Sequence, residues 1–248
     1  MQLTSIARAS ALVATMLGAA MLSASAGAHQ IWLEQNDQHA SVYFGEFGDN
    51  LREVSPGLLD KFSLKNASLV APGGSKTLQA SKSAAAFALN GKVAPGETII
   101  VEENSYPGWE NKKDGKVTYA IWTPAARLVA DHSAQKAALT LDLVPTGIPG
   151  QFQLSYRGQP LAGVKVNAVV QSGWSREAWS DKQGLVSFAL PWQGRYVLEV
   201  HHEDKTGGER DGKYYDQASY VTTLSLVQPQ GVAPLPAPPA AEPSKDHG

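Results

Sequence analysis

Short runs of apolar residues, many of them alternating with polar ones, recur along the chain, and turn-forming residues interrupt them at regular intervals. Successive side chains of a strand point to opposite faces, so alternation of this kind is typical of half-buried strands. The runs are Ile31–Leu33, Ala40–Phe44, Ala67–Val70, Ala84–Leu89, Thr98–Val101, Lys116–Trp122, Leu139–Val144, Gln151–Arg157, Val164–Val170, Leu185–Leu190, Gly194–His202 and Tyr220–Leu226. Short strands separated by Gly, Pro and Asp turns predict an all-β protein built as β-sandwiches.

One stretch in the first half departs from the strand pattern. Ser55 is a suitable N-cap, and Pro56 suits a first helical turn. The apolar residues Leu58, Leu59 and Phe62 would then share one buried stripe. We therefore expect one short helix in an otherwise all-β chain.

The strongest boundary signal is the Pro- and Gly-containing segment 145–150. It predicts two β-sandwich domains, a β-rich one over 29–144 and a second one over 150–228. The remaining segment, 229–248, is rich in Pro and Ala. We expect this tail to be extended and disordered, because it has no core to fold onto.

The first 28 residues have the pattern of a secretory signal peptide. Arg8 is followed by an apolar run from Ala9 to Leu22 and then by the small residues Ala26-Gly27-Ala28. The apolar run is short for a membrane span, so we expect removal of the leader rather than anchoring. Cleavage after Ala28 would make His29 the first residue of a protein located in the periplasm and not embedded in a membrane.

Composition excludes several classes of function. The chain has no cysteine, which excludes disulfides, thiolate zinc sites, cysteine nucleophiles and a lipidated cysteine anchor. Its formal net charge is −2, so it has no electrostatic footprint for nucleic acid. No Gly-x-Ser-x-Gly elbow, phosphate loop or His-Glu-x-x-His motif is present, and we expect a protein that is not an enzyme.

A histidine at a new N-terminus offers two nitrogen donors to one metal ion. The free α-amine, whose pKa is about 8, and the imidazole can close a small chelate ring near neutral pH. A further nitrogen would complete a site suited to Cu(II) or Ni(II). The alternative is that His29 stands first by chance, since cleavage must leave some residue first.

Further candidate ligands lie in the second half. His201 and His202 end a predicted strand, and successive residues of a strand face opposite ways. The apolar pattern of Tyr196–Val200 directs His202 inward and His201 outward, although a solvated surface pair is the alternative. His132 lies in a polar connection and is a fourth candidate. The predicted metal ligands are thus His29, His202, His201 and His132.

Three other residues are candidates for supporting a metal site. Trp32 either shields the metal or belongs to the core, and Glu34 either orients an imidazole or is exposed. Asp216 ends a charged loop, Glu203–Asp216, and would supply an oxygen or shielding. Another long polar loop, Glu102–Gly115, carries Tyr106 and Trp109. Loops of this length are often functional, and the alternative is that both are solvated connections.

The segment Ala28–Glu34, Ala-His-Gln-Ile-Trp-Leu-Glu, resembles the Ala-His-x-x-Trp-Leu start of a bacterial exported family of unknown function. That family is described as additional periplasmic components of nickel or cobalt uptake, the NikM/NikK-like group. In the second half, Gly158–Val164, Asp181–Gly184 and Gly194–Tyr196 are similar to the same group. They also resemble the prealbumin-like, carboxypeptidase-regulatory-like sandwich. The resemblance implies immunoglobulin-like or prealbumin-like sandwiches and transition-metal handling in the periplasm.

Together these observations predict a soluble periplasmic protein that binds Ni(II), Cu(II) or Co(II) at its mature N-terminal histidine. Its partner would be a membrane metal-uptake transporter or an outer-membrane receptor. The alternative is a metal-free binding or scaffold module for an envelope receptor or a glycan. A third class, an oxidative copper enzyme, lacks a recognisable substrate platform in the sequence.

Overall fold

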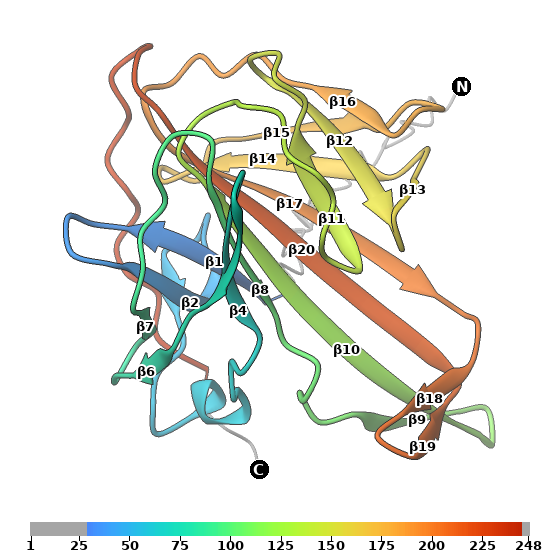
Figure 1. Ribbon diagram of the computed structural model, residues 1–248. Coiled ribbons are helices and arrows are strands. Elements are labelled where there is room, and N and C mark those ends of the chain that lie inside the picture. Colours follow the sequence, from blue (N-terminus) through green and yellow to red (C-terminus); the bar gives the residue numbers. More distant parts are fainter. Residues whose placement is uncertain (1–28, 245–248) are drawn as a thin grey trace, which may run out of the picture.

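The computed structural model of the chain describes residues 29–244. The predicted leader, 1–28, lies outside the described residues, as do residues 245–248. Within the described range nearly every regular element is a strand, and the strands form several sheets that pack in a sandwich-like manner (Figure 1). The predicted all-β class is confirmed. The described range holds no helix with the length and apolar character that a bilayer crossing requires.

A nine-stranded sheet forms the centre of the molecule. In spatial order its strands are β15 (Ser175–Trp179), β14 (Lys165–Val170), β17 (Gly194–Asp204), β20 (Gln217–Gln228), β10 (Lys116–Val129), β8 (Thr98–Glu102), β4 (Ala67–Ala71) and β5 (Gly74–Thr77), with β9 (Trp109–Lys113) beside β10. β10 and β20 pair in parallel, from Ala120 opposite Gln217 to Leu128 opposite Ser225. Strands from both sides of segment 145–150 therefore share one sheet, and the division into two domains stays a prediction.

Two smaller sheets cover this central sheet. One consists of β1 (Gln30–Gln35), β2 (Ala40–Glu46), β7 (Phe87–Leu89) and β6 (Ala80–Lys82), with β3 (Leu51–Arg52) beside β2; the other consists of β11 (Leu141–Pro145), β12 (Gln151–Tyr156) and β13 (Gln159–Pro160), with β16 (Leu185–Ser187) beside β12. In Figure 1 the long strands β10, β17 and β20 run diagonally between β1–β2 and β11–β12. The two strands that belong to none of these sheets, β18 (Gly208–Arg210) and β19 (Lys213–Tyr215), form a separate hairpin.

Alternating residues of β10 contribute to the two main hydrophobic cores. Ile121 and Val129 lie in the core under β11 and β12. Ala126 and Leu128 lie in the core under β1 and β2. The central sheet thus has an apolar layer on each face, as expected for strands that are covered on both sides.

The predicted short helix is one 3-10 turn, Leu58–Lys61. Leu59 in the turn and Phe62 directly after it are buried, whereas Leu58, the third residue of the predicted stripe, is half-buried. The Asp60 carboxylate accepts hydrogen bonds from Ser55 Oγ (2.7 Å) and from the Gly57 N–H (3.0 Å). So short a segment cannot repay the cost of starting an α-helix, and these side-chain bonds hold a single turn instead.

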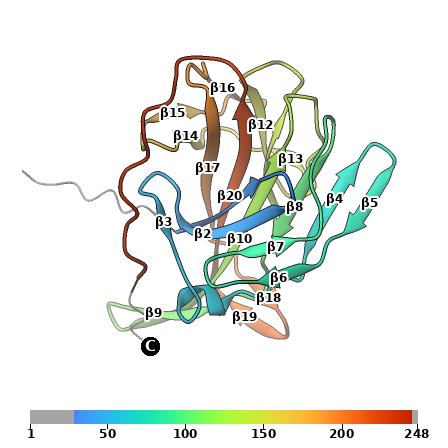
Figure 2. The same cartoon turned by 90° about the vertical axis from the view of Figure 1, so that its left-hand side faces the viewer.

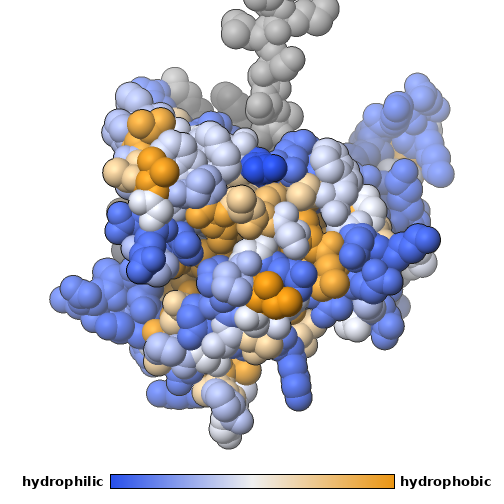
Figure 3. All heavy atoms as spheres, turned by 90° about the horizontal axis from the view of Figure 1, so that it is seen from above, coloured by the Kyte–Doolittle hydropathy of each residue, from blue (hydrophilic) through white to orange (hydrophobic). Residues whose placement is uncertain are grey.

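The described part of the tail, 229–244, crosses the body of the protein in contact with it, which corrects our expectation of a tail without a packing partner. The N–H of Val232 donates to the Pro191 carbonyl (2.8 Å), and the N–H of Gln193 donates to the Val232 carbonyl (2.9 Å). The described part of the tail runs down one side of the molecule in Figures 1 and 2. Seen from above, the molecule has an apolar area surrounded by hydrophilic residues (Figure 3).

Candidate functional site

His29 lies directly before β1, in a pocket of about 360 Å³ between the β1–β2 sheet and the central sheet. The pocket is lined by His29, Phe44, Leu58, Tyr106, Trp109, Trp122, His201, Ser219 and Val221. Two of the four predicted ligands, His29 and His201, therefore line the same pocket although they lie far apart in the sequence. Aromatic rings form much of the wall, so the imidazoles face a largely apolar hollow.

Both ring nitrogens of His29 face carboxylates. Nε2 donates to Glu53 Oε1 at 2.6 Å, and Nδ1 lies 3.4 Å from Glu46 Oε1. The side chain of Glu53 is 1% exposed, whereas that of His29 is 27% exposed. A neutral imidazole that donates from Nε2 keeps its lone pair on Nδ1. In that tautomer the lone pair of Nδ1 points to the side of Glu46.

The turn between β2 and β3 places these two carboxylates on either side of the imidazole. Gly45 pairs with Arg52 there, and its φ of +141° lies in the region that favours glycine. A Cβ on Gly45 would lie 2.3 Å from the Leu51 carbonyl oxygen. Because the two strands approach so closely, Glu46 at the end of β2 and Glu53 just after β3 both reach His29.

More negative charge gathers beside Glu46. Burial, a hydrogen bond with Asp49 and the charges of Asp49 and Glu199 together raise the pKa of Glu46 to about 7, against the lowering effect of His29. Glu46, Asp49 and Glu199 also line a neighbouring cavity of about 170 Å³. Glu199 is in turn hydrogen-bonded to the Nε2 atom of His201. The site therefore combines two imidazoles with a group of carboxylates.

Among residues 29–244, no group of three or more His, Asp or Glu side chains is arranged to hold a metal ion. The imidazoles are instead engaged in pairs, His29 with Glu53 and His201 with Glu199. In the full chain the nitrogen of His29 also belongs to a peptide bond with Ala28. The extra donor that leader cleavage would supply is therefore no part of this arrangement.

The other two predicted ligands do not line this pocket. His202 lies on the opposite face of β17 from His201, with its ring 4.6 Å from that of Tyr156, and burial lowers its pKa. His132 lies in the β10–β11 connection, 6.3 Å from the Phe152 ring. Both histidines thus belong to the side of the molecule where β12 packs.

The predicted supporting residues have other contacts. Trp32 is fully buried in a small core and donates from Nε1 to Glu34 (2.9 Å). Glu34 also accepts from Arg52 (2.9 Å) and Arg195 (3.0 Å), so it anchors arginines rather than an imidazole. Asp216 accepts from the Tyr119 N–H (2.7 Å) at the far end of β10.

Sequence reasoning missed the carboxylates that do contact the imidazoles, Glu46, Glu53 and Glu199. One of them carried a usable signal, because Glu199 precedes His201 by two positions and so shares its face of the strand. Glu53 carried none, since its burial depends on how β3 folds back on β2. The role that we predicted for Glu34, orienting an imidazole, is filled by Glu53.

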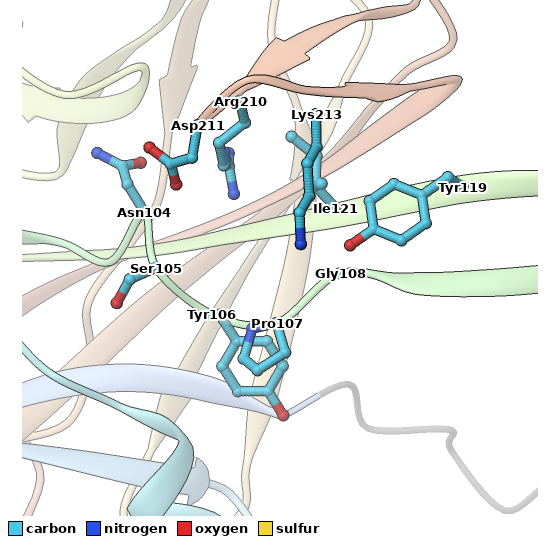
Figure 4. A pocket seen from close by; sticks show the side chains of 10 residues that line it. All are labelled: Asn104, Ser105, Tyr106, Pro107, Gly108, Tyr119, Ile121, Arg210, Asp211 and Lys213. Atoms are coloured by element: carbon cyan, nitrogen blue, oxygen red, sulfur yellow. The ribbon is translucent and has the colours of Figure 1, made fainter.

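The two long loops meet at a second cavity, of about 350 Å³ (Figure 4). The first loop contains the strand β9, and the second contains the hairpin β18–β19. Both lie at the same end of the molecule in Figures 1 and 2. Arg210 donates to the Trp122 carbonyl (3.1 Å) and to the Thr123 hydroxyl. It thereby binds one backbone carbonyl and one side-chain hydroxyl of β10, between the segments that pair with β8 and β9. Tyr106 lines both this cavity and the His29 pocket.

The fold and the site together define a class: an all-β, sandwich-like protein that holds a histidine between two carboxylates, one of them buried, at the head of its first strand. The chain belongs to the family described as domain of unknown function DUF4198, whose model matches residues 26–204. The matched range begins just before His29 and includes Glu46, Glu53, Glu199 and His201. No curated protein matches the chain, and no solved structure matches it.

Proposed function

We propose that the protein binds a divalent transition-metal ion, Ni(II), Cu(II) or Co(II), at His29 after removal of the leader. The observation that carries the proposal is the bond from His29 Nε2 to the buried carboxylate of Glu53. Metal-ligating histidines commonly donate their second ring N–H to a carboxylate, which fixes the ring and makes the other nitrogen a better ligand. Nδ1 and a freed α-amine on the same residue would then form a chelate.

The neighbouring side chains suit the same ion. Glu46 lies beside Nδ1 and can supply an oxygen. His201 lines the pocket with a side chain that is 42% exposed, so its ring has room to exchange Glu199 for a metal ion. Nitrogen donors with a carboxylate favour Cu(II), Ni(II) and Co(II) over Mg(II) or Ca(II). This donor set does not distinguish among the three metals.

The wider role that we propose is metal capture in the periplasm and delivery to a membrane uptake transporter or an outer-membrane receptor. The Ala-His-x-x-Trp-Leu start, which resembles the NikM/NikK-like group, supports this role. The absence of cysteine fits a nitrogen- and oxygen-based site. We propose binding rather than catalysis, because the site supports chelation without any further chemistry.

Isothermal titration calorimetry on two secreted forms tests the proposal. One form begins at His29, and the other carries one extra residue before it. We expect tight binding of Ni(II), Cu(II) or Co(II) by the first form and a large loss by the second. A His132→Ala variant of the first form is the control and keeps its affinity. Unchanged tight binding after the extension would exclude the amino-terminal chelate.

A second candidate function is metal-free binding of an envelope glycan or receptor. The supporting observation is the aromatic wall of the same pocket, where the Trp109 side chain is 41% exposed beside Tyr106 and Trp122. Exposed tryptophan is common in binding surfaces of this kind. Titration of a glycan panel, followed by tryptophan fluorescence of the wild type and of Trp109→Ala, tests this function. A panel that leaves the fluorescence unchanged in the wild type rejects the glycan version.

A further inference from the structure

The tail reaches the His29 site at its last described residue. Along the way it is held at Asn50, whose side-chain amide donates to the Pro238 carbonyl (2.9 Å), and by a bridge between Leu51 and Ala241. At the site, the N–H of Ser244 donates to both oxygens of Glu53, at 3.1 and 3.3 Å. Ser244 Oγ lies 3.4 Å from His29 Nε2. The tail is therefore a structural neighbour of the imidazole.

These contacts fall on one edge of the imidazole only. Ser244 and Glu53 face Nε2, whereas Glu46 faces Nδ1. The two nitrogens point away from each other, so the tail contacts the Nε2 edge of the ring and leaves the Nδ1 edge to Glu46. A buried carboxylate such as Glu53 needs several hydrogen-bond donors, and both His29 and Ser244 donate to it.

We propose that residues 229–244 form a strap that positions His29 and Glu53 for metal binding, so that strap docking and metal binding stabilise each other. The proposal rests on the function proposed above. Ser244 is a positioning residue, because it acts on the ligand through Glu53 and the Nε2 edge. Coupling of this kind is reciprocal: a strap that tightens metal binding is itself held more firmly when the metal is bound.

Truncation of the mature protein tests the strap. Three forms that all begin at His29 end at residue 248, 244 or 228. We expect the first two to bind the metal equally and the form ending at 228 to bind roughly tenfold more weakly, as for other losses of a group that orients a ligand. Equal affinity of all three forms would overturn the proposal.

A matched pair of substitutions isolates the contact with Glu53. Ser244→Pro removes the N–H that donates to the carboxylate. Ser244→Ala keeps the N–H and removes only the hydroxyl. We expect Ser244→Pro to lose affinity as the short form does and Ser244→Ala to stay near the wild type. Equal affinities of Ser244→Pro and Ser244→Ala would count against the strap.

Two further readouts separate the strap from a merely structural effect and from the proposed function. In metal-free protein, ¹⁵N NMR of the His29 ring should show one tautomer in the form ending at 244 and a mixture in the form ending at 228. With metal, amide hydrogen exchange over residues 238–244 should slow. If the full protein binds no metal, the proposed function fails, and the NMR comparison alone decides whether the tail positions the ring. Identical ring spectra in the two forms would reject the strap.

Discussion

At the scale of single residues, the imidazole of His29 depends on a carboxylate that the sequence did not single out. We expect Glu53→Gln in the mature protein to weaken metal binding by about 10- to 100-fold, because an amide oxygen holds the Nε2–H less firmly than a carboxylate does. Competition with a coloured chelator measures the change. Glu34→Gln is the control, since Glu34 contacts Trp32 and two arginines but not His29. An equal loss in Glu34→Gln would contradict the assignment.

A second pair of residues tests stability rather than binding. Arg127 and Asp142 form a buried ion pair, with Nε–Oδ1 and Nη2–Oδ2 distances of 3.0 and 2.6 Å and side chains that are 1% and 0% exposed. Arg127→Met leaves a buried carboxylate without its cation, so we expect a loss of about 3–5 kcal/mol in the free energy of unfolding. Lys165→Met, which breaks the exposed pair with Glu177, should cost about 1 kcal/mol or less. Urea unfolding at pH 7 measures the loss of stability in each variant. Similar losses in the two variants would contradict the expected difference between the buried and the exposed ion pair.

At the scale of elements, Glu103 joins the end of β8 to two loops. Burial raises the pKa of Glu103, but hydrogen bonds from the Ser105 side chain and from the N–H groups of Leu64, Ser105 and Ser63 outweigh it and set the pKa below its ordinary value. A depressed pKa means that the charged form stabilises the fold above the unfolded pKa of about 4.3 and that this stability is lost as the pH falls through the folded pKa. Glu103→Gln should therefore be less stable than the wild type at pH 7 and pH 5. The difference in free energy of unfolding between the two proteins should narrow below about pH 4. Urea midpoints at these pH values measure the difference, and a difference that is constant down to pH 3 would contradict the account.

The elements also show what local sequence can and cannot predict. Strands such as β14 and β17 were predicted from their alternating pattern, although each also has three consecutive buried residues, Ala168–Val170 and Tyr196–Leu198. The strand β5 has four exposed residues, and β9 is mostly polar, so neither carries that signal. Alternation along β17 separated the faces of His201 and His202, but it could not say that β1 would cover the His201 side. That choice depends on packing between distant segments, which single-strand patterns do not contain.

At the scale of the whole molecule, the parallel pairing of β10 with β20 joins the two predicted domains in one sheet. No local feature predicts such a pairing, because it links segments about a hundred residues apart and needs both cores to be formed. Ile121 and Val129 of the first half are also buried in the core that β12 and β20 build. The folding free energy of each half thus depends on the presence of the other half.

We therefore expect the fragment 29–144 to be unable to fold alone. Without β20, the strand β10 would expose a long unpaired edge and the apolar side chains of its second face, which is costly in water. The isolated fragment should give a poorly dispersed NMR spectrum, whereas the mature protein should unfold in one transition by both circular dichroism and tryptophan fluorescence. Adding the fragment 145–244 in trans should restore dispersion, since the missing strand then becomes available. A well-dispersed spectrum for 29–144 by itself, or two separate unfolding transitions, would show that the shared sheet does not bind the halves into one cooperative unit.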